Sequence, residues 1–455
     1  MDKAFAPYTF LAKFFRHGRK GFFVLYCTQT YAVIQEVSMY QQINLPNGAR
    51  LLTQHLPQAQ SAALGFFVGV GSRHEAPSEN GAAHFIEHML FKGTARRSAG
   101  QLAQDMDAIG GQVNAYTTKE HTCFYARTLG SHLDRGLDIL SDMLFHSRFA
   151  QQDVALERGV ILEEIDMYED TPEDLVAERL SAAVYKGTAL ARPILGRQST
   201  LNHMTGEWLA RWQKQHYHAG NLVVSLAGNF TQGQVQSLTD LLASLEPGKP
   251  SSITPVSYRP AVTVKKKAIE QNHLILAFPA PNYLDERRQQ VALLNALLGG
   301  GCSSRLFQQL REQRGLCYTV YSYVADHQDT GLLGIYVGLN QEQERAALDL
   351  ARNVVADLAD HGPTQEEVDR VREQAKANLL MGTESVQARM SHLGGSALLY
   401  GKIRETEELV ELYDAVTREQ LRDLAGDMFS MDQASLSAVG RVSPAQEYAA
   451  WLGRA

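Results

Sequence analysis

The chain has 455 residues, which is enough for at least two domains with sizeable cores. Hydrophobic residues make up 44% of it and charged residues 20%, an ordinary balance for a globular protein, and a formal net charge of −7 excludes a global basic field for nucleic acid. Four scattered cysteines without a CxxC pair argue against a zinc ribbon or a disulfide scaffold, and no apolar run reaches the roughly 18 residues that a membrane span needs.

Residues 1–38 allow three interpretations. Their basic and then apolar sequence resembles a weak signal peptide, but residues 27–30 interrupt the apolar run and no small-residue cleavage site follows. A basic organellar presequence is the second interpretation. An N-terminal extension without a structural role, which need not be ordered, is the third. We favour the extension, because Met39 stands directly before the first strand-like segment.

Strands and helices alternate along the rest of the chain. In chain order, the patterns of apolar residues predict strands at 62–72, 121–129 and 222–230, with helices at 131–146 and 153–185 between them. Four prolines, a glycine and two serines mark residues 246–260 as a linker. The pattern then starts again, with strands at 273–281 and 331–339 and a helix at 286–298.

The two halves resemble each other in the order of their elements. A long helical segment opens with QQDVALER at residue 151 and with QEEVDRVR at residue 365, and both segments close in similar motifs. We therefore predict an α+β fold of two homologous domains, each a mainly antiparallel sheet packed against helices. The expected parts are a catalytic zinc-binding domain at 39–245, the linker at 246–260 and a homologous domain without zinc at 261–455.

The segment GAAHFIEHMLFKGT, residues 81–94, carries His84, Glu87 and His88 in an otherwise apolar helix, with Ser78 and Asn80 as its expected N-caps. Residues i and i+4 share a helix face, so both imidazoles can bind one ion, while the carboxylate lies beside it. Two structural histidines are the alternative, but burial of three ionisable groups without an ion would be costly. The order HxxEH is a known catalytic signature, and it predicts one Zn²⁺ per chain.

A third ligand is expected from the helical segment at residues 155–170. Glu157 and Glu164 lie seven residues apart, two turns along one face, so both are candidates. Glu163 faces away from them by about 100 degrees. Val154 and Val368 occupy equivalent positions in the two matching helical segments. At the same separation along the chain Glu164 corresponds to Asn378, so we expect a metal site in the first half alone.

With these motifs the chain resembles the pitrilysin/insulysin family of zinc peptidases, the inverzincins. Within that family it is similar to the short two-domain type, which includes the mitochondrial processing peptidase β subunit and bacterial relatives. The resemblance runs from about residue 41 to the C-terminus. It implies that Glu164 is the third zinc ligand, at the expected kind of separation from His88. It also implies that Glu157 is a supporting acidic residue that orients or neutralises the zinc shell.

Two further segments resemble substrate-holding parts of the family. Residues 299–322 resemble its glycine-rich turn, helix and strand, which implies that Arg311 and Tyr318 hold the substrate at the zinc. Without the resemblance they would be interpreted as a solvated helix charge and a core aromatic. Residues 114–126 resemble the edge strand that pairs with the substrate backbone, which implies contacts from Asn114 and Ala115, an ordinary edge strand being the alternative.

The resemblance implies a zinc metalloendopeptidase that uses a zinc-bound water. Glu87 is then the general base, and Tyr318 with Arg311 stabilises the oxyanion. Short members of the family hydrolyse short or unfolded peptides in a closed chamber of four homologous domains, which implies a homodimer, or a heterodimer with a degenerate homologue.

Two other functions remain as alternatives. One is a peptidase dedicated to a single leader or presequence. The other is a non-catalytic core subunit of a larger complex, a class that typically lacks the HxxEH motif present here. We expect a peptide substrate and a cytoplasmic, bacterial-type location in preference to an organellar matrix, because scattered cysteines fit a reducing compartment.

Overall fold

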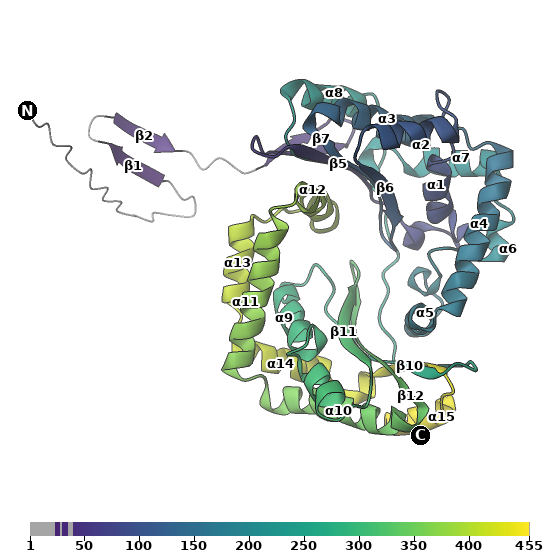
Figure 1. Cartoon of the computed structure of the whole chain (residues 1–455), viewed down its shortest axis with the longest axis vertical. Coiled ribbons are helices and arrows are strands. Elements are labelled where there is room, and N and C mark those ends of the chain that lie inside the picture. Colours follow the sequence, from purple (N-terminus) through teal and green to yellow (C-terminus); the bar gives the residue numbers. More distant parts are fainter. Residues whose placement is uncertain (1–22, 28–29, 35–39, 455) are drawn as a thin grey trace, which may run out of the picture. The chain divides into compact units, whose positions relative to one another are not determined.

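The computed structural model describes residues 23–27, 30–34 and 40–454 (Figure 1). The chain divides into two compact units, Met1–Gln41 and Gln42–Ala455. In the first unit, β1 (Phe23–Cys27) and β2 (Thr30–Ile34) pair as an antiparallel hairpin. The rest of the expected N-terminal extension lies outside the described residues.

The first sheet has six strands in the order β3-β4-β8-β5-β7-β6. Its strands are β3 (Gln41–Asn44), β4 (Arg50–His55), β5 (Ser61–Val68), β6 (Gln112–Thr117), β7 (Thr122–Leu129) and β8 (Leu222–Gly228). β4 and β8 are parallel, and the pairs from β8 to β6 are antiparallel. The central β5 and β8 are buried along almost their whole length, as their nearly continuous apolar sequences require, whereas β6 alternates at the edge.

The second sheet has five strands in the order β11-β12-β10-β13-β9. Its strands are β9 (Val262–Lys266), β10 (Gln271–Ala280), β11 (Thr319–Asp326), β12 (Gly331–Asn340) and β13 (Ser435–Gly440). β9 and β13 are parallel, and the other pairs are antiparallel. Taken from β9, the strand order β9-β13-β10-β12-β11 therefore matches the order β4-β8-β5-β7-β6 of the first sheet. In both sheets the first pair is parallel and the other pairs are antiparallel. The predicted fold, two homologous domains with mainly antiparallel sheets packed against helices, is confirmed.

Helices pack against both sheets. Those of the first half are α1 (Ala82–Leu90), α2 (Ala99–Ala108), α3 (Leu133–His146), α4 (Gln151–Asp170), α5 (Pro172–Val184), α6 (Gln198–Leu201), α7 (Gly206–His216) and α8 (Gln232–Ala243). Those of the second half are α9 (Arg288–Gly299), α10 (Glu344–His361), α11 (Gln365–Gly382), α12 (Val386–Gly395), α13 (Thr406–Asp414), α14 (Arg418–Met428) and α15 (Ala445–Trp451). Among the described residues, no helix is long and apolar enough to cross a membrane.

The single helix expected over residues 153–185 is two helices. Thr171 has extended backbone angles (φ −99°, ψ 100°) and Pro172 is the first residue of α5. Proline cannot donate to the preceding turn, so α4 ends there and a new helix begins. The second half repeats this break. α4 and α11 begin at positions 151 and 365, and α5 and α12 begin at positions 172 and 386, so the same number of residues separates the two helices of each pair.

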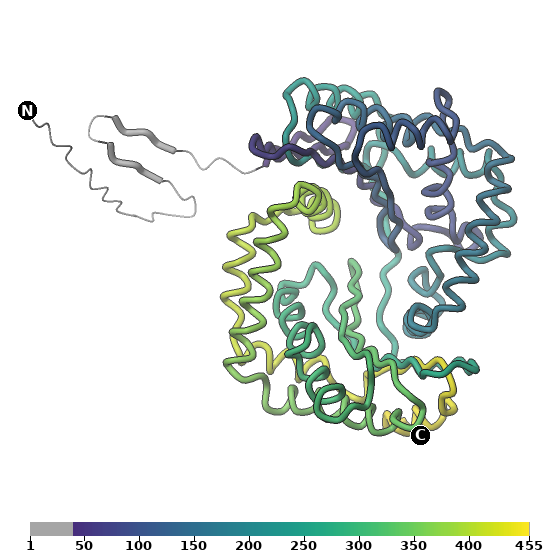
Figure 2. Tube along the Cα trace, viewed as in Figure 1, coloured from purple at the N-terminus to yellow at the C-terminus, as the bar shows by residue number. Residues whose placement is uncertain are grey.

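The two halves exchange these short helices. α12 of the second half packs on β4, β5 and β8 of the first sheet, and α5 of the first half packs on β9, β10 and β13 of the second sheet. In Figure 2 the yellow-green trace of α12 lies beside the purple strands of the first half. Glycines permit the close approach of α12: a Cβ on Gly394 would lie 2.1 Å from the ring of Phe67, and one on Gly65 would lie 2.3 Å from the sulfur of Met390. Each sheet is therefore buried partly by a helix of the other half.

Candidate metal centre

Helix α1 is the apolar helix expected from GAAHFIEHMLFKGT, and seven of its nine residues are buried. Its N-cap is Gly81, which has a left-handed backbone (φ 99°) and no capping side chain, so the expected caps Ser78 and Asn80 are wrong. The buried carboxylate of Glu75 takes their place and accepts hydrogen bonds from the backbone N–H groups of Gly81 and Ala83, both at 2.9 Å. A carboxylate at a helix N-terminus complements the helix dipole.

Glu75 supports the helix of the site, and sequence reasoning missed it. It lies six residues before the N-cap, outside the spacing of a capping box, so no local pattern marks it. Asn80 Nδ2 also donates to its carboxylate, at 3.1 Å. Burial raises the pKa of Glu75 to about 7, although these hydrogen bonds oppose the shift.

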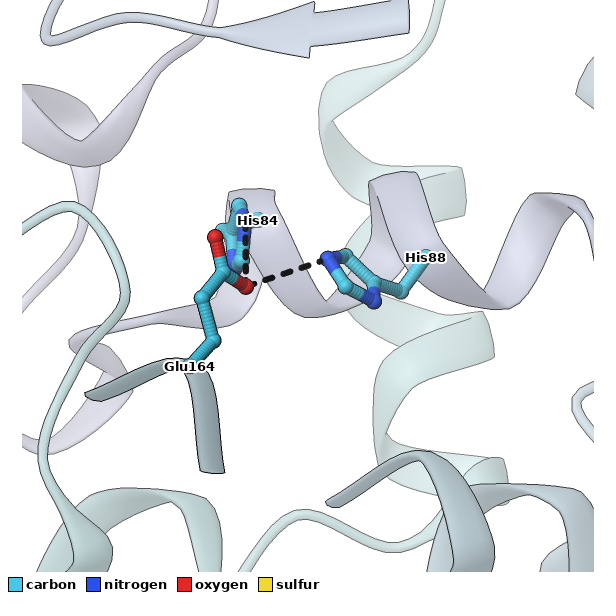
Figure 3. A group of neighbouring side chains, drawn as sticks. All are labelled: His84, His88 and Glu164. Atoms are coloured by element: carbon cyan, nitrogen blue, oxygen red, sulfur yellow. Dashed lines mark ion pairs between the residues drawn. The ribbon is translucent and has the colours of Figure 1, made fainter. Parts of the chain in front are cut away.

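His84, His88 and Glu164 come together where α1 packs against α4 (Figure 3). Oε2 of Glu164 lies 3.6 Å from Nε2 of His84 and 3.6 Å from Nε2 of His88. One ligand atom from each side chain lies within 4.8 Å of the others. Within the described part of the chain, this is the one group of three His, Cys, Asp or Glu side chains with metal-ligand spacing.

The geometry and chemistry of this group fit a zinc ion. Nitrogen and oxygen ligands about 2.0–2.2 Å from Zn²⁺ lie roughly 3.3–3.5 Å apart in a tetrahedral site, close to both measured separations. Burial, with a contribution from His88, lowers the pKa of His84 to about 3. His84 is therefore neutral near pH 7 and keeps the lone pair that a metal ligand needs.

Glu157 lies behind the metal-facing side chains rather than among them. Its Oε1 lies 2.9 Å from Nδ1 of His88, and its Oε2 lies 2.6 Å from Nζ of Lys92. Its side chain is buried, whereas Glu163, which was expected to face away, is exposed. The structure therefore places Glu157 in contact with a ligand candidate, and of the two glutamates it is Glu164 that faces both histidines.

Glu87 shares helix α1 with both histidines, and a neighbouring strand holds its carboxylate. The hydroxyl of Thr117, in β6, donates a hydrogen bond of 2.6 Å to Oε2 of Glu87. Burial raises the pKa of Glu87, and the hydrogen bond from Thr117 opposes the shift. Sequence reasoning did not find Thr117, because its partner lies 30 residues away on another element.

Asn114 and Ala115 lie on β6, the terminal strand of the first sheet. The side chain of Asn114 is exposed, and its Oδ1 accepts a hydrogen bond from the backbone N–H of Ala115. Because β6 pairs only with β7 in this sheet, one side of its backbone has no strand partner there. The position expected for these two residues, at a sheet edge, agrees with the structure.

Arg311 and Tyr318 lie in the second half and contact each other. The guanidinium of Arg311 lies 5.0 Å from the ring centroid of Tyr318, and the Tyr318 side chain is 74% exposed. Tyr318 is therefore no core aromatic. Within residues 40–454, neither side chain forms a hydrogen bond or ion pair with His84, His88 or Glu164.

Comparison with known proteins gives matches over most of the chain. The family model described as insulinase (peptidase family M16) matches residues 50–198, and the one described as peptidase M16 inactive domain matches residues 203–375. An uncharacterized zinc protease of Bacillus subtilis is 39% identical over 397 residues, which are 87% of this chain and 97% of the relative. One from Streptomyces coelicolor is 37% identical over 420 residues, 90% of this chain and 91% of the relative.

Among solved structures, the peptidase M16 inactive domain from Pseudomonas fluorescens has a similar fold. The TM-score is 0.82 at 22% identity, over 89% of this chain and 98% of that chain.

Proposed function

The chain belongs to peptidase family M16, the insulinase family, and on that premise we propose that it is a zinc-dependent metalloendopeptidase. The observation that carries the proposal is that His84, His88 and Glu164 come together beside Glu87, which lies on the same helix as the two histidines. The zinc protease names of its relatives agree with this donor set.

His84, His88 and Glu164 would hold the ion, with Glu157 supporting His88. Zinc, when bound there, supplies a Lewis acid that lowers the pKa of a water toward 7. The equivalent position in the second half lacks this ligand, because Asn378 corresponds to Glu164 in the repeat. This agrees with one ion per chain.

Glu87 acts as the general base. It takes a proton from the attacking water and later passes it to the leaving amine. The hydroxyl of Thr117 occupies Oε2 of its carboxylate, which leaves Oε1 to receive the proton. Burial raises the pKa of Glu87, and this brings its basicity closer to that of a base suited to near-neutral pH.

The substrate backbone adds to the open edge of β6 as an extra strand, next to Asn114 and Ala115. β6 contacts α1, and Thr117 of the same strand bonds to Glu87, so a peptide on this edge would lie beside the general base. The exposed Tyr318, with Arg311, would hold the substrate from the second half and stabilise the oxyanion.

We further propose a homodimer that encloses short or unfolded peptides in a chamber, with residues 39–245 as the catalytic domain and 261–455 as the second domain. A heterodimer with a degenerate homologue is the alternative assembly. A peptidase dedicated to one leader or presequence would share this chemistry and differ in the range of its substrates. A non-catalytic core subunit is less favoured, because such a role would not require the complete set of His84, Glu87, His88 and Glu164.

The test is a digest of an unstructured peptide library by zinc-loaded protein, read by mass spectrometry. We expect wild type to cleave, Glu87→Gln to bind zinc without cleaving, and Glu163→Gln, which removes an exposed carboxylate of helix α4, to behave as wild type. Cleavage by Glu87→Gln at the normal rate would overturn the assignment of the base. Cleavage of one leader peptide alone would favour the dedicated peptidase.

A further inference from the structure

Each half contains a cavity between its two repeated helices and the segment that follows them. The cavity of the first half has a volume of about 380 Å³ and lies between α4, α5 and residues 191–198. The cavity of the second half has a volume of about 190 Å³ and lies between α11, α12 and residues 403–406, with Gln54 of β4 also in its wall. Because α4 corresponds to α11 and α5 to α12, the two cavities are equivalent in the repeat.

The lining residues support this equivalence position by position. The first residues of α4 and α11 are separated by the same offset as those of α5 and α12. The lining residues Ile165, Tyr168, Glu169, Leu175, Glu178 and Arg179 of the first cavity correspond at this offset to Leu379, Gly382, Thr383, Arg389, His392 and Leu393, all of which line the second. The chemistry of the two cavities can therefore be compared directly.

The lining of the second cavity has fewer acidic groups than that of the first, one in place of two, and the same number of arginines, two. Thr383 and His392 replace the carboxylates of Glu169 and Glu178. Arg389 replaces the apolar Leu175, and Leu393 replaces Arg179, so the guanidinium group stands at a different position of the wall. Arg404, from the segment after α12, adds a second guanidinium. The wall otherwise includes three aliphatic side chains and one carboxylate: Leu379, Leu393, Ile403 and Glu405.

The lining of the second cavity carries a net positive charge, because its two guanidinium groups outnumber its one carboxylate. Arg389 donates from Nε to the backbone oxygen of Thr383, a neutral acceptor. Nε of Arg404 lies 3.6 Å from Oε1 of Glu408, and the same oxygen accepts a hydrogen bond of 3.2 Å from Nζ of Lys402. Glu408 therefore divides its charge between two cations, and the cavity keeps positive charge beside an apolar wall.

We propose that this second cavity binds the C-terminal residue of a peptide, with its free carboxylate at Arg389 and Arg404 and an apolar side chain against Leu379, Leu393 and Ile403. The planar guanidinium group matches a carboxylate in two parallel hydrogen bonds. A volume of about 190 Å³ exceeds the roughly 150 Å³ that admits a benzene molecule, so it suits one side chain and is too small for a lipid or a nucleotide. That the ligand is a peptide rests on the proposed function.

The test compares two peptides that differ only at the C-terminus. N-acetylated, fluorescently labelled octapeptides ending in leucine, one with a free carboxylate and one with a C-terminal amide, are titrated into the zinc-loaded full chain carrying Glu87→Gln. We expect the acid to bind at least about tenfold more tightly, a difference of roughly 1.4 kcal/mol in binding free energy. Arg389→Gln should abolish this preference, while Arg345→Gln, which removes an exposed guanidinium of α10, should keep it.

Arg404→Gln is the second variant, because it leaves the contact between Arg389 and Thr383 intact, and we expect it to weaken the preference as well. Equal affinities for acid and amide, or a preference that survives both substitutions, would overturn the proposal; in the latter case the carboxylate binds elsewhere, for example at zinc. Cleavage of the amide peptide by protein with Glu87 intact tests the peptidase separately, so either proposal can fail alone.

Discussion

Nδ1 of His88 lies 2.9 Å from Oε1 of Glu157, and this contact determines which nitrogen of the His88 ring faces Glu164. An ionised carboxylate can only accept, so Nδ1 carries the proton and Nε2 keeps its lone pair. Nε2 is the atom that lies 3.6 Å from Glu164. Lys92, at 2.6 Å from the other oxygen of Glu157, offsets the charge of the buried carboxylate.

Glu157→Gln should therefore weaken zinc binding without removing a ligand. Loss of the negative charge makes Nε2 of His88 less basic and leaves Lys92 without its partner. Partners of this kind typically contribute roughly 10–100-fold in metal affinity, and we expect a loss in this range. A competition titration with a chromophoric chelator measures it, with Glu163→Gln as the matched control on the same helix. Unchanged affinity would show that Glu157 does not support the metal.

Thr117 provides a test of how Glu87 is positioned. Thr117→Val removes the hydroxyl that holds the carboxylate of Glu87, and misplacement of a catalytic group can cost up to about 100-fold in rate, so we expect kcat to fall roughly tenfold or more while zinc content stays at the wild-type level. Thr117→Ser keeps the hydroxyl and should retain most of the activity. The measurement is steady-state cleavage of a quenched fluorescent peptide together with zinc analysis. If valine is as active as threonine, the hydrogen bond does not orient the base.

The parts of the site that could be predicted from the sequence are those set by local spacing. His84 and His88 are one turn apart on a single helix, so their shared direction follows from helix geometry. Glu164 required the family resemblance, because seven-residue spacing fits Glu157 equally well. The repeat was visible as well, because two matching helical segments are long enough to stand out.

What could not be predicted are contacts between residues far apart in the chain. Thr117 reaches Glu87 only because β6 packs beside α1, and no sequence pattern links the two. The exchange of α5 and α12 between the halves could not be predicted either, because the buried apolar residues of each helix do not indicate which sheet it packs on. Glu75 caps α1 from six residues before its N-cap, a distance that no capping motif covers.

Glu75 makes a pH-dependent contribution to stability. Its pKa rises from the ordinary value of 4.5 to about 7 in the folded protein. Between these values the folded chain holds a proton that the unfolded chain has lost, so this contribution to the free energy of unfolding falls as pH rises through the window and is constant above about 7. Glu75→Gln cannot ionise. Thermal unfolding without zinc should therefore show wild type losing stability relative to Glu75→Gln between about pH 4.5 and 7.

The control for this prediction is Glu79→Gln. Glu79 lies in the same loop, but its carboxylate accepts from the backbone N–H of Ala76 at an exposed turn. The difference in thermal stability between wild type and Glu79→Gln should not change with pH in the way expected for Glu75→Gln. A difference between wild type and Glu75→Gln that is independent of pH would contradict the prediction.

A buried arginine connects the two halves and the segment at residues 246–260. The side chain of Arg73 is 1% exposed, and its guanidinium lies 2.6 Å from Glu120 in the first half and 2.6 Å from Asp329 in the second. It also donates to the backbone oxygen of Thr254 in the segment between them, and Asp329 accepts from the backbone N–H of Val256 in the same segment.

Asp329→Ala should destabilise the protein far more than the loss of an exposed ion pair. It leaves Arg73 buried with one carboxylate partner in place of two and removes the acceptor of the Val256 N–H. Breaking a buried pair typically costs about 3–5 kcal/mol, whereas Asp427→Ala, which removes a 72% exposed partner 3.6 Å from Arg287, should cost about 1 kcal/mol or less. Denaturant unfolding compares the two, and limited proteolysis should cut Asp329→Ala faster within residues 246–260. Equal stability of the two variants would mean that Arg73 does not hold the halves together.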